Sequence, residues 1–286
     1  MILDENYILN DSRKIPKLGF GTWMLTDEEA KNAVAHAIKT GYRLIDTAQA
    51  YDNAAGVADG IRESGINRES VFITSKVRAE YKTYESAKKS IDETLERMKL
   101  DYIDMMIIHA PQPWDEFRGE KRYFAENRGV WRALEDAKKE GKVLSIGVSN
   151  FLKDDLDNIL SSCEIKPAVN QILTHISNTP LDLIEYSNKN GIHCEAYSPI
   201  AHGEALKNKV IAETAEKYGV SPASLCIRYV IELGMTALPK ATSYGHIDSN
   251  AKIDFKISES DMEILKQTDK IKDYGEYTFF PVFSGK

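Results

Sequence analysis

Short β-rich runs alternate with longer segments of helical periodicity along nearly all of the 286 residues of this chain. Such alternation is typical of β/α units, which assemble their strands into a parallel sheet. We count eight candidate strands, and eight is the number at which the sheet closes into a (β/α)8 TIM barrel. The candidate strands are 18–23, 43–48, 71–77, 102–110, 143–150, 167–172, 193–200 and 235–241.

The segments between these runs begin and end with residues that favour helix termini. Thr26 and the acidic residues 27–29 are typical of a capped N-terminus, and Gly41 follows the last turn of that helix. Ser221 and Pro222 open the helix before the eighth strand. Before the first strand, the sequence YILNDSRKIPKLG predicts a β-hairpin that turns at 10–12. The longest irregular insert is expected at 111–128, and long loops at the C-terminal face of a barrel usually serve the site.

Composition predicts one globular domain spanning 1–286. Hydrophobic residues make up 42% and charged residues 28% of the chain, with no linker rich in Pro, Gly or Ser to divide it. A formal charge of −7 argues against non-specific nucleic-acid binding, which usually needs a basic face. We expect small-molecule ligands and a monomer.

Cysteines and hydropathy indicate the compartment. Cys163, Cys194 and Cys226 are odd in number and widely separated, so they suggest neither a disulfide framework nor a zinc site. No apolar run approaches the roughly 20 residues of a spanning helix, and no basic leader with an apolar core begins the chain. We therefore expect a cytoplasmic protein that does not insert in membranes.

Four polar residues lie at or just after the C-terminal ends of three candidate strands. Asp46 ends RLID, Tyr51 follows it by five residues, Lys76 ends VFITSK and His109 ends YIDMMIIH. The C-terminal ends of barrel strands converge on one mouth, where active sites lie. A phenol, an ammonium, a carboxylate and an imidazole together can deliver a proton to a carbonyl and orient it. The set predicts carbonyl reduction.

The stretches DTAQAY, ITSK and IIH resemble the catalytic motifs of the aldo-keto reductase family. The similarity continues in order through GFGTW, GVSNF, NQ, AYSP and LPK. It implies that Tyr51 is the general acid, that Lys76 lowers its pKa, that Asp46 holds Lys76 and that His109 orients the substrate carbonyl. A cation about 4 Å away is worth roughly 4 kcal/mol at an effective dielectric constant near 20, so we expect a more acidic phenol.

The same resemblance implies a nicotinamide dinucleotide bound across the barrel mouth. No GxGxxG motif opens a helix after a strand, so a Rossmann site is not indicated. Ser149, Asn150 and Gln171 match groups that hold the carboxamide, and Tyr197 matches the aromatic ring that stacks on the nicotinamide. The full implied cofactor set is Gly21, Thr22, Trp23, Asp46, Ser149, Asn150, Gln171, Tyr197, Ser198, Ile200, Lys240, Thr242, His246 and Asn250.

At the adenine end the chain departs from the family pattern. His246 stands where NADP(H)-preferring members have an arginine that grips the 2′-phosphate, whereas Lys240, Thr242 and Asn250 are present. Histidine offers fewer donors than arginine and is mostly neutral above a pKa of about 6.5. We favour NADP(H) as the cofactor, with NAD(H) possible because of His246.

The predicted substrate contacts are Trp23, Tyr51, His109 and Trp114. The tail GEYTFFPVFSGK carries four aromatic residues that either close over the mouth or pack against the barrel base. The other histidines show no metal-ligand spacing, so we expect no metal and interpret them as ordinary polar residues or supporting neighbours of the site. They are His36, His175, His193 and His202.

Two other functions stay open at this point. A lyase or aldolase barrel would use Lys76 as a Schiff base. A regulatory module would bind the cofactor with little turnover, which the intact quartet argues against. Within the family, the stretches PQPW and SPIAHGEAL look most like microbial small-molecule reductases near the 2,5-diketo-D-gluconate reductase group.

Overall fold

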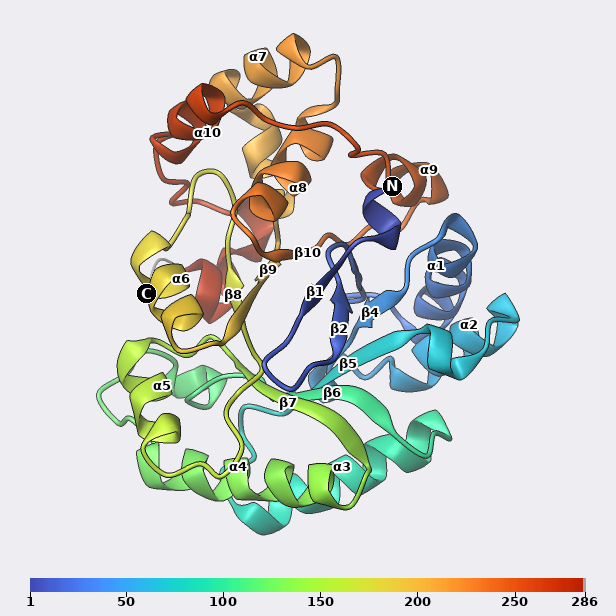
Figure 1. Cartoon of the computed structure of the whole chain (residues 1–286), viewed down its shortest axis with the longest axis vertical. Coiled ribbons are helices and arrows are strands. Elements are labelled where there is room, and N and C mark those ends of the chain that lie inside the picture. Colours follow the sequence, from blue (N-terminus) through green and yellow to red (C-terminus); the bar gives the residue numbers. More distant parts are fainter. Residues whose placement is uncertain (285–286) are drawn as a thin grey trace.

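Eight parallel strands form a closed barrel with helices around it in the computed structural model, which describes residues 1–284 (Figure 1). Neighbouring strands follow one another in chain order. A bridge between Leu18 and Ala237 joins the two ends of the sheet, so the predicted (β/α)8 barrel is confirmed. The strands are β3 (Phe20–Gly21), β4 (Leu44–Asp46), β5 (Phe72–Val77), β6 (Ile103–Ile108), β7 (Val143–Ser149), β8 (Val169–Leu173), β9 (His193–Tyr197) and β10 (Thr236–Leu238).

Each predicted strand overlaps one observed strand, but several end earlier than expected, and β8 extends one residue beyond the predicted 167–172. Strand β9 ends at Tyr197 because Ser198 takes a left-handed backbone conformation, with φ of 51°. Strand β10 ends at Leu238, and the next residue, Pro239, has no N–H to offer a ladder. The polar residues after these points are therefore in loops at the mouth, where side chains can face a ligand.

The helices lie outside the strands and bury their apolar faces against them. Thr26 caps the first helix as expected and forms a capping box with Glu29, and Gly41 ends the helix with φ of 120°. Pro222 begins the helix before the last strand, as predicted. The helices are α1 (Asp27–Thr40), α2 (Ala54–Ser64), α3 (Tyr84–Met98), α4 (Phe124–Lys139), α5 (Lys153–Leu160), α6 (Leu181–Lys189), α7 (Lys209–Lys217), α8 (Pro222–Glu232), α9 (Tyr244–Asn250) and α10 (Glu259–Lys266).

The insert expected at 111–128 is shorter than predicted. Helix α4 begins at Phe124, because Val130, Trp131 and Leu134 form a buried stripe that continues the helical period toward the N-terminus. The irregular part therefore ends at Tyr123 and contains one short 3-10 turn, Trp114–Glu116.

The predicted hairpin closes the N-terminal end of the barrel. Its strands are β1 (Asn6–Ile8) and β2 (Lys14–Pro16), and Figure 1 shows it in blue across the barrel. Leu9 and Ile15 pack in one buried cluster with residues of the barrel strands, among them Leu44 and Val169, which begin β4 and β8. The opposite end is left as the mouth.

The C-terminal tail lies over the mouth, which decides between the two positions considered for it. Tyr277, Phe280 and Phe283 have ring centroids 6.1, 5.6 and 5.9 Å from that of Trp23. Residues 285 and 286 of the predicted tail and domain lie outside the described residues. Within 1–284, none of the helices has the length and apolar character needed to cross a bilayer.

Replacing Ile15 by alanine tests the role of the hairpin as a plug. Ile15 is 0% exposed, so the Ile15→Ala change should lower the free energy of unfolding by about 3 kcal/mol through lost burial and a cavity. Ile8→Ala is the matched control, because Ile8 in the same hairpin is 72% exposed. Chemical denaturation measures both, and equal losses in the two variants would contradict a packed hairpin.

Candidate active site

A buried ion pair lies at the centre of the mouth. Lys76 Nζ donates to Asp46 Oδ1 at 2.6 Å and to Oδ2 at 2.8 Å, and it also donates to the carbonyl oxygen of Thr47 at 2.9 Å. Tyr51, on a 3-10 turn after β4, has its hydroxyl oxygen 3.3 Å from Lys76 Nζ, so the three hydrogens of the ammonium are shared among four oxygens. The structure thus brings the predicted carboxylate, ammonium and phenol into direct contact.

His109 completes the quartet from the end of β6. Its ring centroid is 5.7 Å from that of Tyr51 and 5.1 Å from that of Trp114, both with the edge-to-face orientation. Nδ1 of His109 is buried and has no hydrogen-bond partner in the described part of the chain. Nε2 is therefore the nitrogen available to a ligand.

The expectation that the phenol of Tyr51 has a lowered pKa is wrong. Burial raises the pKa of the phenol above its usual value, and this effect outweighs the opposing effect of the Lys76 ammonium. The prediction considered the cation alone and did not include the loss of water around the ring. The phenol is consequently protonated at neutral pH, which is the state that a general acid needs.

The imidazole of His109 is neutral and the ammonium of Lys76 is charged, although both side chains are buried. Burial, with Lys76 and Arg78 nearby, places the pKa of His109 well below its ordinary value, so the imidazole is neutral. Burial favours the neutral amine of Lys76, but the Asp46 carboxylate prevails and raises the pKa of Lys76. A neutral imidazole can donate one N–H to a carbonyl oxygen without carrying the proton that is transferred.

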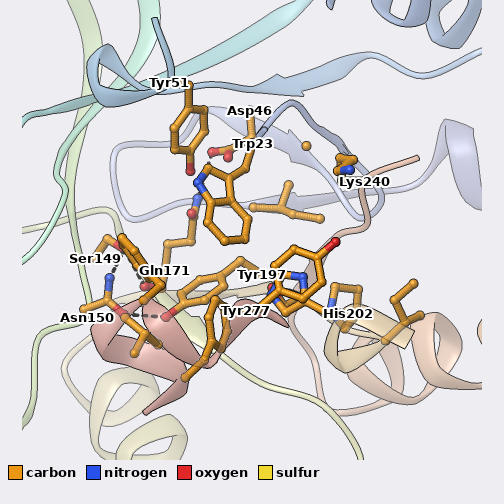
Figure 2. Close-up of a pocket in the computed structure, with 18 of the residues that line it drawn as sticks. Trp23, Asp46, Tyr51, Ser149, Asn150, Gln171, Tyr197, His202, Lys240 and Tyr277 are labelled. Atoms are coloured by element: carbon orange, nitrogen blue, oxygen red, sulfur yellow. Dashed lines mark hydrogen bonds between the residues drawn. The ribbon is translucent and has the colours of Figure 1, made fainter. Parts of the chain in front are cut away.

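These residues lie at the floor and wall of a cavity of about 240 Å³ (Figure 2). All four predicted substrate contacts line the cavity, so Trp114 of the irregular insert lies in the same wall as Trp23, Tyr51 and His109. Lys76 does not line the cavity, and it contacts the lining residues Asp46 and Tyr51. The predicted cofactor residues that line the cavity are Gly21, Trp23, Asp46, Ser149, Asn150, Gln171, Tyr197, Ser198, Ile200 and Lys240.

The four residues implied to hold the nicotinamide are linked by hydrogen bonds. Tyr197 donates its hydroxyl to Asn150 Oδ1 at 2.7 Å, and Asn150 Nδ2 donates to Ser149 Oγ at 3.0 Å (Figure 2). Ser149 Oγ donates to the backbone carbonyl of Gln171 at 2.8 Å. These bonds join the ends of β7, β8 and β9 into one polar wall that could pair with a carboxamide and present an aromatic face beside it.

Four predicted cofactor residues do not line this cavity. Thr22 is fully buried and donates its hydroxyl to the backbone carbonyl of Asp46, so it supports the floor from below. Thr242, His246 and Asn250 lie in or just before α9, away from the quartet. Their role at the adenine end stays a prediction.

His202 was interpreted as an ordinary polar residue or a supporting neighbour of the site, and the structure places it in the cavity wall itself. Its ring is stacked on Tyr277 with centroids 4.1 Å apart, and it meets Trp23 at 5.3 Å (Figure 2). Burial lowers the pKa of His202 to about 4, so the ring is neutral. The segment after AYSP carried no periodicity from which this contact with the tail could be foreseen.

Glu195 is a second residue that the sequence interpretation missed. It lies in the middle of β9, is 0% exposed, and accepts a hydrogen bond from Gln171 Nε2 at its Oε2. Burial, together with the charge of Asp46, raises the pKa of Glu195 to about 7. A carboxylate between Cys194 and Ala196, inside a strand of buried residues, was the signal that could have revealed it.

Comparisons with known proteins identify the family of this chain. Residues 17–270 match the model of the "Aldo/keto reductase family". Glyoxal reductase of Bacillus subtilis (strain 168) is 39% identical over 275 residues, which are 96% of this chain and 96% of that protein. A 9,11-endoperoxide prostaglandin H2 reductase of Trypanosoma cruzi (strain CL Brener) is also 39% identical, over 96% of this chain and 95% of its own length.

Solved structures give the same result for the fold. An aldo/keto reductase of Brucella melitensis superimposes with a TM-score of 0.86 at 36% identity, covering 92% of this chain and 98% of the other. An aldo-keto reductase of Bombyx mori in complex with NADP has a TM-score of 0.86 at 28% identity, covering 98% of each chain. The chain therefore belongs to the aldo/keto reductase family of oxidoreductases.

Proposed function

We propose that this protein reduces small aldehydes and ketones to alcohols with a nicotinamide cofactor. The observation that carries the proposal is the Lys76 ammonium, held by Asp46 on one side and 3.3 Å from the Tyr51 hydroxyl on the other, beneath a cavity with a neutral His109 beside it. Members of the same family, such as the glyoxal reductase, are named for this reaction class.

The residues of the mouth fit a nicotinamide. Tyr197 would stack on its ring, and Ser149, Asn150 and Gln171 would hold its carboxamide, since all four line one wall. The cofactor supplies a hydride when it is bound. Tyr51 donates its proton to the carbonyl oxygen, and His109 donates a hydrogen bond to the same atom, so charge does not build up on the oxygen.

The cavity favours uncharged carbonyl substrates. Its outer part is aromatic, with Trp23, Trp114, Tyr277 and Phe280 around the opening. Lys240, at the end assigned to the cofactor, is the only Lys or Arg among the lining residues that the structure describes. Small aldehydes and dicarbonyls of the glyoxal type suit such a wall better than keto acids do.

The geometry does not favour the two alternative functions, a Schiff-base lyase or aldolase and a regulatory module. A Schiff base needs a neutral and accessible amine, whereas Lys76 is 1% exposed and the Asp46 carboxylate keeps it charged. A cofactor-binding regulator with little turnover would not need the assembled proton-delivery set. The closer relation to diketogluconate reductases stays a prediction.

We further propose that the enzyme works as a monomer in the cytoplasm. One chain supplies the whole cavity wall, and three separate cysteines give no disulfide framework. NADP(H) is the favoured cofactor, because Lys240 lines the cavity, Thr242 follows it closely, and a 2′-phosphate would favour the protonated form of the His246 imidazole.

The Tyr51→Phe change tests the proton donor. Removing one hydroxyl should lower the rate of carbonyl reduction by at least about 100-fold, because general acid catalysis contributes about that much, while cofactor affinity stays nearly unchanged. Loss of reduced nicotinamide absorbance gives the rate, and fluorescence titration gives the affinity. Tyr102→Phe, far from the cavity, is the control, and near-normal turnover of Tyr51→Phe would reject the assignment.

The pH profile of reduction follows from the two pKa directions. The pKa of His109 lies below its ordinary value near 6.5 and that of Tyr51 above its ordinary value near 10, so both groups are in the active form between these limits. We expect kcat/KM for reduction to be flat from about pH 7 to about pH 9. A midpoint of activity loss inside that range would show that a different group donates the proton.

The His246→Arg change tests the adenine end. Wild-type enzyme should use NADPH more efficiently than NADH, and the arginine should increase that preference by about tenfold, since a guanidinium binds phosphate bidentately and is always charged. Initial rates with both cofactors measure the ratio. A wild-type kcat/KM for NADH equal to or above that for NADPH would overturn the NADP(H) preference.

A further inference from the structure

The side-chain amide of Gln171 lies between two carboxylates. Its Nε2 donates to Asp46 Oδ2 at 2.9 Å and to Glu195 Oε2 at 3.1 Å. An amide nitrogen has two hydrogens, and these two bonds use both of them. An ionised carboxylate has only acceptors, so the opposite orientation would place the carbonyl oxygen of Gln171 against two negatively charged groups.

The protonation state of Glu195 does not change this result. Oε1 of Glu195 is buried and has no partner within residues 1–284, whereas Oε2 is occupied by the amide of Gln171. A proton on this carboxyl group would reside on Oε1, and Oε2 would still accept from Gln171. The restraint therefore applies whether or not Glu195 carries charge.

Gln171 is left with one free polar atom at the cavity. Gln171 lines the cavity, whereas Glu195 does not. The Oε1 atom of Gln171 accepts no hydrogen bond from residues 1–284. The neighbouring Asn150 has no free donor, because its Nδ2 hydrogens go to Ser149 Oγ and to the backbone carbonyl of His109. Oε1 of Gln171 is thus an unpaired acceptor in this wall.

Asp46 alone does not determine this orientation. Its Oδ2 is shared between Gln171 and Lys76, and a single bond would leave the second N–H of the amide free to turn toward the cavity. Glu195 occupies that second hydrogen from the neighbouring strand β9, where it is paired in register with Gln171.

We propose that Glu195 is a positioning residue, which together with Asp46 fixes Gln171 so that its carbonyl oxygen accepts a hydrogen bond from the amino group of the nicotinamide carboxamide. The inference rests on the proposed use of a nicotinamide cofactor. In this role Glu195, which lies outside the cavity, helps the site to select a carboxamide over a group of the same shape that has no N–H donors.

Binding of two cofactors tests this role without turnover. One is NADP⁺, and the other is its 3-acetylpyridine analogue, in which a methyl group replaces the amino group of the carboxamide. Quenching of protein fluorescence reports binding, since Trp23 and Trp114 line the cavity. Wild-type protein should bind NADP⁺ about tenfold more tightly, because the analogue leaves Gln171 Oε1 unpaired.

Three variants separate positioning from general damage. Glu195→Met keeps the side-chain length but removes the acceptor, and should reduce the affinity ratio to about threefold or less. Glu195→Gln retains an acceptor oxygen and should keep the wild-type ratio. Glu135→Met is the matched control, because Glu135 is also buried but binds backbone N–H groups of 164 and 165 away from the cavity.

The outcomes distinguish the two proposals. An unchanged ratio in Glu195→Met, or a reduced ratio in Glu195→Gln or Glu135→Met, would overturn the positioning role alone. If wild-type protein binds neither dinucleotide, the proposed function fails and the role of Glu195 with it. Should Glu195→Met not fold, as judged by circular dichroism, the smaller Glu195→Thr replaces it, with the same expected loss.

Discussion

The ion pair between Asp46 and Lys76 is the interaction on which the rest of the site depends. Both side chains are almost fully buried, and removing a charge from water is costly unless the partners are close and their other hydrogen-bonding groups are satisfied. Here the carboxylate accepts from Lys76 and Gln171, while the ammonium also donates to Thr47 and Tyr51. The pair therefore contacts the Tyr51 hydroxyl on one side, the proposed proton donor, and the Gln171 amide on the other, the proposed partner of the carboxamide.

The barrel supplies the geometry that this pair needs. Parallel strands β4 and β5 are neighbours, with Asp46 opposite Thr74 in register, so Lys76 reaches the carboxylate from two residues farther toward the mouth. The hairpin closes the other end of the barrel, and the aromatic tail covers the opening beside Trp23. Exclusion of water penalises the charged forms of both side chains, which is why burial controls the protonation of Tyr51 and His109.

Much of this site was predictable from the chain alone. Eight strand-like runs indicated the barrel, and the polar residues at their ends indicated which side chains would meet, because the ends of parallel strands share one face. The position of His202 in the cavity wall and that of Glu195 beside Gln171 were not predicted. The first depends on a stack with Tyr277, 75 residues later in the chain, and the second on a hydrogen bond across two strands. Neither contact leaves a periodic pattern in the sequence.

By itself, the sequence determined the barrel, the approximate positions of its strands and the four polar residues that meet at its mouth, since periodicity and strand ends are local properties. Only the tertiary structure decided that the tail covers the mouth, that Tyr51 stays protonated despite the nearby cation, and that Gln171 is held between two carboxylates. The physical reason is that burial and the distances between charges arise when segments far apart in the chain come together, and both the pKa of a side chain and the orientation of an amide depend on them.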